Sequence, residues 1–496
     1  MNGVWRSLLW KEWREQRWKA VLLLAAALPS LAIPSMGQTD AAGILVSCLT
    51  FSFLAASLFL GAGAAASEQS QRTAAFLQSL PISTKWSAAT KLASALVVLW
   101  LPISIFFIAN QMWKGQLDYP AHVVPFETFA IITGLALSSL LIWMAATGVN
   151  LGDEIRAGAI GFLVIVCCWA LAAWLPRPTW GRPSSVLDRA VSGLLPGGVW
   201  FVAVELEMRA TNSALGQTIE RGSLWPLVIA AILSNSALAA SYVWRFGRVA
   251  SPRQQSVEAN SPTAEVAWLA PPMQRPGTAI LWKQCCESLP LSLLGAGSIL
   301  CVSLIIDFVS REYQHGILND GLLSMSIPVW LMIGGLVSIV SGIGLWLDDL
   351  RPELNTFWRS RPIATGQWFA VKFAVSALIT LATLALPSLL IYGLVAWLGD
   401  RPAFQQLGPT DWPPVIALGL LSQFGFFSAA AAFMAATRRP MVSALLTIFT
   451  AAGVAFCVVG PFSLEATGSA VVIAAISVLA TAAGWLCIRH DWAIGR

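Results

Sequence analysis

The sequence predicts an all-α polytopic membrane protein, on the evidence of its composition, its long apolar runs and the placement of its charges. Of the 496 residues, 57% are apolar and 11% are charged, against about 25% charged in an ordinary soluble domain. The mean hydropathy is +0.70. A soluble protein of this size needs more polar residues to cover its surface. The net charge of +5 is small for a nucleic-acid-binding protein of this length, so no nucleic-acid partner is expected.

The apolar runs define the predicted transmembrane helices. About 20 helical residues cross the ~30 Å hydrocarbon core of a bilayer. The runs are continuous and do not alternate, which favours helices over barrel strands. Only four charged residues fall inside them, each near the end of a run: Lys91, Glu127, Asp307 and Lys372. The twelve predicted spans are 20–38, 45–66, 87–110, 126–150, 157–175, 223–244, 288–310, 322–346, 368–398, 413–436, 441–460 and 468–488.

Basic residues predict the orientation. With the N-terminus in the cytoplasm, the cytoplasmic segments hold 22 Lys and Arg and the opposite segments hold 8. Positive charge gathers on the cytoplasmic side of membrane proteins. We therefore expect a multi-pass protein of the cell (cytoplasmic) membrane with both termini in the cytoplasm. The long, Trp-rich start carries Glu12 and Glu15, which is not typical of a secretory signal peptide.

Two short motifs recur in matching topological places and predict an internal repeat. The spacing between the two copies of the second motif also relates Glu68 to Asp349 and Lys91 to Lys372. Because each half has six spans, the halves share one orientation and form parallel repeats. The predicted organisation is a six-span half over 1–245, a Pro-rich cytoplasmic linker over 246–277 and a second half over 278–496. The motif pairs are Leu9-Trp10-Lys11-Glu12 with Leu281-Trp282-Lys283-Gln284, and Phe76-x-x-Ser79-x-Pro81-Ile82 with Phe357-x-x-Ser360-x-Pro362-Ile363.

The first residues are predicted to form an amphipathic helix at the membrane interface. Trp5, Leu9 and Trp13 recur at helical spacing, with Trp10 at the edge of the stripe. A helix that lies in the headgroup plane before the first span fits this pattern, with membrane lipid as its partner. A simple aromatic and basic interface anchor is the alternative. A second short helix is expected over 194–204, lying at the outer membrane surface or dipping into it, because this apolar stretch is too short to span. A small helix packed on the ends of the spans is the alternative.

The loops after the second and eighth spans are predicted to dock a soluble partner. Each is about twenty residues long, where a few suffice for an ordinary connection. Each carries mixed charge, an aromatic residue and then a proline, Pro81 or Pro362, that ends a short helix. The alternative is that the arginines of these loops serve only to orient the protein during membrane insertion. That alternative does not account for Phe and Pro, which recur at the same spacing in both loops.

Taken together, these motifs resemble the permeases of ATP-binding-cassette (ABC) transporters of the second exporter type. The resemblance implies that each half begins with an in-plane helix and places a cytoplasmic coupling helix between its second and third spans. It also implies a separate ABC ATPase subunit, in two copies, that binds ATP and Mg²⁺. The chain has no G-x-x-x-x-G-K-[ST] loop of its own. The resemblance is carried by Leu9-Trp10-Lys11-Glu12, by Glu68, Thr73, Phe76, Leu77, Leu80, Pro81, Ile82, Ser83 and Lys91, and by Asp349, Thr356, Phe357, Trp358, Arg361, Pro362, Ile363 and Lys372.

The expected function is a permease, not an enzyme, with no cofactor or metal of its own. It would couple ATP hydrolysis in the partner to movement of an apolar or amphipathic substrate. A secondary transporter and a non-transporting regulatory subunit are the alternatives, although no predicted span carries a charge near its middle. Lys91 and Lys372 are expected to extend to the headgroups. The expected ATPase contacts are the anchors Phe76 and Phe357, the polar rim of Glu68, Arg72, Asp349, Arg351 and Arg361, and the adjoining Thr73, Thr356, Pro81 and Pro362.

Overall fold

The described part of the chain is a bundle of long helices. The computed structural model describes residues 2–28, 40–70, 83–113, 126–151, 154–174, 186–200, 225–247, 276–313, 321–347, 349–350, 364–398, 412–459 and 466–493, and none of these residues lies in a strand. They form thirteen helices: α1 Asn2–Ala27, α3 Asp40–Ser70, α5 Thr84–Trp113, α6 Phe126–Gly148, α7 Glu154–Trp174, α8 Val186–Leu194, α10 Trp225–Arg245, α11 Pro276–Tyr313, α12 Gly321–Leu347, α14 Thr365–Leu398, α16 Trp412–Thr437, α17 Pro440–Val459 and α18 Ala466–Arg489.

Each predicted span coincides, wholly or in part, with one of these helices. Nine of the helices, as far as they are described, are long and apolar enough to cross a membrane. They are α3, α5, α6, α10, α11, α12, α14, α16 and α18. The predicted spans at 20–38, 157–175 and 441–460 are not among them, and α17 contributes a shorter apolar stretch, Pro440–Val454. The all-helical, multi-pass architecture is therefore as predicted, and the count of twelve stays a prediction.

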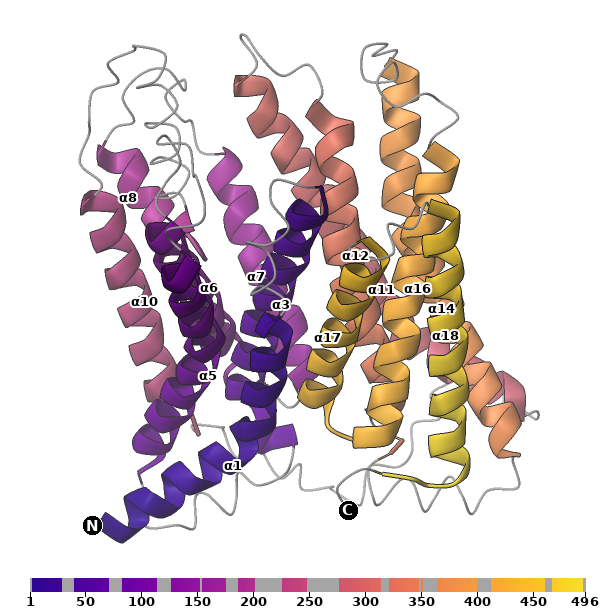
Figure 1. Ribbon diagram of the computed structural model, residues 1–496, viewed down its shortest axis with the longest axis horizontal. Helices are drawn as coiled ribbons and strands as arrows, with labels where there is room; N and C mark the ends of the chain where they lie inside the picture. Colours follow the sequence, from indigo (N-terminus) through magenta and orange to yellow (C-terminus); the bar gives the residue numbers. More distant parts are fainter. Residues whose placement is uncertain are drawn as a thin grey trace, which may run out of the picture.

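Neighbouring helices pack in a regular scheme (Figure 1). In the first part of the chain, α1 packs on α5, α3 packs on α6 and α7, and α6 packs on α10. In the second part, α11 packs on α14, α12 packs on α16 and α17, and α16 packs on α18. The two parts meet where α17 contacts α1 and α3 and where α7 contacts α11. Figure 1 shows that α1 begins and α18 ends at the same side of the bundle.

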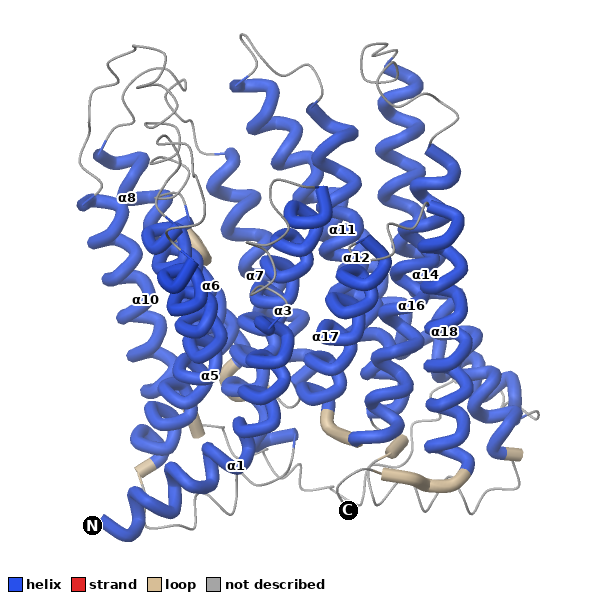
Figure 2. The backbone as a smooth tube through the Cα atoms, in the orientation of Figure 1, coloured by secondary structure: helices blue, strands red, loops and turns tan. Residues whose placement is uncertain are grey.

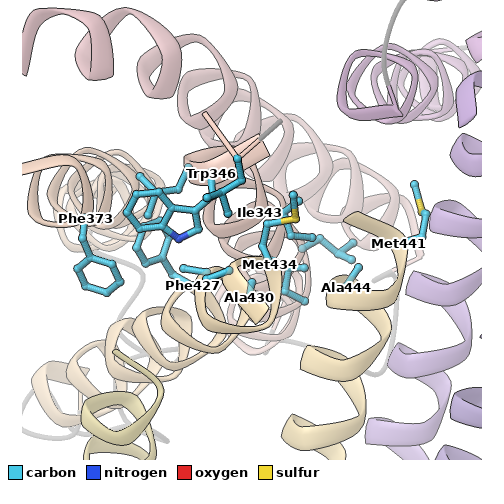
Figure 3. Close-up of a cluster of buried hydrophobic side chains, with 14 of the residues drawn as sticks. Ile343, Trp346, Phe373, Phe427, Ala430, Met434, Met441 and Ala444 are labelled. Carbon is cyan, nitrogen blue, oxygen red and sulfur yellow. The ribbon is translucent and has the colours of Figure 1, made fainter. Parts of the chain in front are cut away.

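The largest core cluster belongs mainly to the second part of the chain and reaches into the first. Ile343, Trp346 and Phe427 are almost fully buried in it, and Figure 3 shows them beside Phe373 and Met434. The same cluster includes Ala55, Leu58 and Ala62 of α3. The α16–α17 connection, which is tan in Figure 2, turns the chain back so that Met441 approaches α3. One apolar core thus joins the two parts of the bundle.

Two glycines at corresponding positions allow close approach between helices. A Cβ atom on Gly61 would lie 2.6 Å from Met144 Cβ and 2.7 Å from the Leu141 carbonyl oxygen, so α3 and α6 touch at this point. A Cβ atom on Gly342 would meet the Phe427 carbonyl oxygen and lie 3.0 Å from Ala430 Cβ, at the contact between α12 and α16. Small residues at such crossings let helix backbones pack closely.

The structure describes only the first part of the stretch 194–204 in which a short helix is expected, since residues 201–204 lie outside the described residues. A short helix, α8 Val186–Leu194, precedes most of this stretch, the chain turns from Leu195 to Val199, and Trp200 is helical again. Pro196 and Gly197 end the helix, because Gly197 takes a φ of +69°, a conformation that side chains with a Cβ rarely adopt. The turn is held by a hydrogen bond of 3.1 Å from the Gly197 amide to Ser139 Oγ of α6.

Candidate functional site: two buried ion clusters and a cavity

A buried cluster of charges joins three helices in the first part of the chain. Glu68, at the end of α3, accepts hydrogen bonds from Lys11 Nζ of α1 at 2.6 Å and from Lys91 Nζ of α5 at 2.8 Å. Glu12 and Glu15 lie near Lys11, at 3.7 and 3.6 Å from its Nζ. We call these five residues the N-terminal cluster. Glu68, Lys91 and Glu12 are all buried, which makes each of these charges dependent on its neighbours.

A second cluster has the same plan in the second part of the chain. Asp349, just beyond α12, accepts a hydrogen bond from Lys283 Nζ of α11 at 3.1 Å and another from Lys372 Nζ of α14. Lys283 also pairs with Glu287 at 3.5 Å. Lys372 donates a further hydrogen bond of 3.0 Å to the Leu345 carbonyl oxygen. We call Lys283, Glu287, Asp349 and Lys372 the C-terminal cluster.

The surroundings shift the pKa values of one group in each cluster. Burial alone would lower the pKa of Lys11, but hydrogen bonding and attraction from Glu68 outweigh it and raise that pKa. Burial alone would raise the pKa of Asp349, but the attraction of Lys372 and then of Lys283 outweighs it and lowers that pKa. Lys11 and Asp349 are both therefore ionised at neutral pH, as an ion pair requires.

The structure corrects the expected surroundings of four repeated residues. Glu68 and Asp349 were expected on an exposed rim, but they are only 5% and 2% exposed. Lys91 and Lys372 were expected to reach the headgroups, but they are only 1% and 3% exposed. The reason is the convergence of three helices: Glu68 meets a lysine from α1 and another from α5, and Asp349 meets a lysine from α11 and another from α14. The contribution of Glu68 and Asp349 to ATPase binding stays a prediction.

The two clusters differ in charge and in neighbours. Glu12 corresponds in the repeated motif to Gln284, which donates a hydrogen bond of 2.8 Å to Ser288. In the C-terminal cluster, Lys372 Nζ lies 5.7 and 5.5 Å from the ring centres of Trp346 and Trp368, within the range of cation–π attraction. The N-terminal cluster thus carries one more carboxylate than lysine, whereas the C-terminal cluster is balanced.

Glu12 is the residue of the N-terminal cluster with the poorest pairing. It is 1% exposed, and neither carboxylate oxygen accepts a hydrogen bond from a described residue. Burial raises its pKa, and the attraction of Lys91 only partly opposes this. The carboxylates of Glu12, Glu15 and Glu68 lie within 4.8 Å of one another, a spacing that a metal ion accepts. The Lys11 ammonium lies within 3.7 Å of all three, so a cation already fills this position.

The first helix presents its predicted aromatic face outward. Leu9, Trp10 and Trp13 are 54%, 64% and 47% exposed. The side chain of Trp5 lies outside the described residues. The helix does not stop before the apolar part: α1 is continuous from Asn2 to Ala27, so no separate in-plane helix precedes it. Its opposite face, which includes Leu8, Glu12 and Gln16, is buried against the bundle.

The remaining predicted ATPase contacts lie outside the described residues. These are Arg72, Thr73, Phe76 and Pro81 in the segment 71–82, and Arg351, Thr356, Phe357, Arg361 and Pro362 in the segment 351–363. Most of the linker, over 248–275, is also outside the described residues. The predicted docking helices, 68–80 and 349–361, begin at the buried acids Glu68 and Asp349, and the structure describes only their first residues, 68–70 and 349–350.

A cavity lies between the two parts of the bundle. Its lining comes from α3, α6 and α7 on one side and from α11, α12 and α17 on the other. The lining is apolar, with side chains such as Phe59, Phe162, Leu336 and Met441. Glu154 is the one ionisable residue among those that line it. An apolar segment of a small molecule or lipid fits such a lining.

Reasoning from the sequence missed the burial of Glu12 and Gln16 and the role of Gly61 and Gly342. A signal for the glycines was present, because Gly61 and Gly342 are related by the same spacing as the buried acids Glu68 and Asp349. No protein-family model matches the chain, and no curated protein matches its sequence.

Proposed function

We propose that this chain is the permease subunit of an ABC exporter, built from two parallel six-span halves with both termini in the cytoplasm. A separate ABC ATPase, in two copies, would hydrolyse ATP and drive an apolar or amphipathic substrate across or out of the cell membrane. The observation that carries this proposal is the doubled ion cluster. In each half, a buried acid ties the first helix, the end of the second and the start of the third into one unit.

The position of the clusters suits the transmission of force. An ATPase that closes on nucleotide must push on a segment that is firmly connected to the spans. The predicted coupling helices, 68–80 and 349–361, each begin at the buried acid and lead to a helix that carries the buried lysine. A push on either segment would therefore act on three helices together. Phe76 and Phe357 would provide the anchors, since buried aromatic residues often dominate interface energetics.

The packing scheme supports the two-half architecture. The neighbours of α1, α3, α5 and α6 correspond to those of α11, α12, α14 and α16, and the contact between α7 and α11 has its counterpart between α17 and α1. The central cavity between the halves supports an apolar or amphipathic substrate, because its lining is apolar and comes from both halves.

The test uses the full chain and the ABC ATPase encoded beside it or co-purified with it. Phe76→Ala with Phe357→Ala should abolish co-purification of the ATPase, or uncouple ATP hydrolysis from transport, while the protein still inserts. Loss of one interface anchor costs about 2 kcal/mol or more, so each single variant should weaken binding measurably. Trp86→Ala is the matched control, since Trp86 is an aromatic residue that is 57% exposed just beyond the first coupling segment.

Three results would replace the proposal. If the double variant binds the ATPase and couples hydrolysis to transport as the wild type does, Phe76 and Phe357 are not the docking anchors. Transport that follows an ion gradient in the absence of any ATPase would favour a secondary transporter. A complex with no transport at all would favour a regulatory subunit.

A further inference from the structure

The outer face of α1 combines large apolar residues with arginines and carries no acid among its exposed residues from Arg6 to Trp18. Leu9, Trp10, Trp13 and Trp18 are all about half exposed or more. Arg6, Arg14 and Arg17 are exposed on the same side. Residues three or four positions apart are neighbours on a helix, so Trp10 lies between Arg6 and Arg14, and Arg17 follows Trp13.

The acids of this helix point the other way. Glu12 is buried and Glu15 is half-buried, and both lie near Lys11 in the N-terminal cluster. The charges of α1 are therefore sorted by face: the carboxylates turn toward the bundle, and three guanidinium groups turn away from it. This sorting gives the exposed face a net positive charge, even though the whole segment contains both signs.

The corresponding part of α11 provides an internal comparison. The apolar positions are retained, because Leu281 and Trp282 correspond to Leu9 and Trp10 in the repeated motif and are also exposed. The arginines are not retained: in the same register Thr278, Cys286 and Leu289 stand in their places, and all three are exposed. The start of α11 therefore packs in the corresponding place without these arginines. Their presence on α1 indicates a ligand that binds α1 and not α11.

We propose that the outer face of α1 is a binding surface for anionic phospholipid headgroups, and that the start of α11 is not. The aromatic residues place this face at the level of the headgroups, where Trp is favoured. The three arginines then meet phosphate groups, which guanidinium binds through paired hydrogen bonds. A soluble acidic partner would not account for four large apolar side chains interleaved with the arginines, whereas an anionic bilayer surface is complementary to both features. This inference goes beyond the proposed function, because it does not depend on an ATPase.

The test measures lipid binding directly. The full-length protein in neutral detergent is titrated with short-chain phosphatidylglycerol or with short-chain phosphatidylcholine, and bound lipid is counted by native mass spectrometry. Each basic residue near an anionic lipid surface contributes about 1 kcal/mol, which corresponds to about fivefold in affinity. The variant with Arg6→Gln, Arg14→Gln and Arg17→Gln should therefore bind phosphatidylglycerol many-fold more weakly and lose its preference over phosphatidylcholine. The preference in the wild type should also fall as salt is raised.

Two further variants make the test specific. Arg156→Gln, Arg439→Gln and Arg489→Gln remove three other exposed arginines and should leave the preference nearly unchanged. Thr278→Arg, Cys286→Arg and Leu289→Arg place the α1 pattern on α11 and should create a second preferred site for phosphatidylglycerol. Equal loss in both arginine-to-glutamine variants, or an unchanged preference in the α1 variant, would overturn the proposal. If the α1 variant keeps its lipid preference but loses the ATPase, the face is a protein interface instead.

Discussion

Removing the carboxylate of Glu68 should destabilise the protein more than removing either of its lysine partners. Glu68→Gln keeps the size of the side chain but leaves Lys91, which is 1% exposed, without its only described carboxylate contact within 4 Å. At an effective dielectric constant of about 20, the attraction across 2.8 Å is roughly 6 kcal/mol. Much of this attraction offsets the cost of removing both charges from water. The net cost of losing one partner of a buried pair is about 3–5 kcal/mol.

The lysine variants should cost less for a structural reason. After Lys91→Met, Glu68 still accepts the 2.6 Å hydrogen bond from Lys11, so its charge remains paired. Combining Glu68→Gln with Lys91→Met should recover part of the loss, because no unpaired buried charge then remains at this position. The four proteins of this double-mutant cycle are compared by thermal unfolding of the purified chain in one detergent. The coupling energy isolates the pair.

Two results would contradict this prediction, and the C-terminal cluster allows the same experiment to be repeated. If Lys91→Met destabilises as much as Glu68→Gln, or if the double variant is no better than Glu68→Gln alone, the acid is not the centre of the cluster. Asp349→Asn and Lys372→Met repeat the experiment in the C-terminal cluster, where Lys283 is the remaining partner of Asp349. Lys372 also has two tryptophan rings beside it, so Asp349→Asn should be the milder of the two acid variants.

Further predictions concern Glu12 and the glycines. Because the folded protein raises the pKa of Glu12, the wild type should lose stability as pH rises from the unfolded pKa through the folded one. Glu12→Gln, which copies Gln284, should remove this dependence and stabilise the protein at neutral pH by about 1–3 kcal/mol; an unchanged pH profile of thermal unfolding would contradict this. Gly61→Ala and Gly342→Ala should each destabilise by about 1–3 kcal/mol, the range for overpacking. The controls Gly63→Ala and Gly344→Ala should be nearly neutral, since their nearest contacts are 3.5 and 3.6 Å, and equal effects at all four sites would refute the close-contact argument.

The helical, multi-pass fold was predictable because lipid imposes simple rules on sequence. A bilayer requires long continuous apolar helices, and the boundaries of the runs at 87–110 and 368–398 fall within α5 and α14. Turns obey local chemistry that hydropathy does not detect. The apolar stretch beginning at Leu194 gave no sign of the turn that Pro196 and Gly197 make directly after α8, Val186–Leu194.

The candidate site was predictable in its members but not in its geometry. The repeat identified Glu68, Lys91, Asp349 and Lys372 as a corresponding set, and the matched starts contained Lys11 and Lys283. Sequence position alone favoured exposure for charges near the ends of spans, since terminal charges commonly reach water. Burial arises because three successive helices converge at each acid, and no local pattern encodes that convergence.

The two clusters share an acid between two lysines, and they differ in how the surrounding residues stabilise it. In the C-terminal cluster, aromatic rings of Trp346 and Trp368 stand close to Lys372 and the charges are balanced. The corresponding residues of the first half are Ala65 and Ser87, so Lys91 has no ring at either position and lies instead among three carboxylates. Each carboxylate of the balanced cluster has a lysine partner, whereas the buried Glu12 of the N-terminal cluster has a raised pKa and can take up a proton. We therefore expect the connection among the three helices to be insensitive to pH in the second part of the chain and to change with pH in the first.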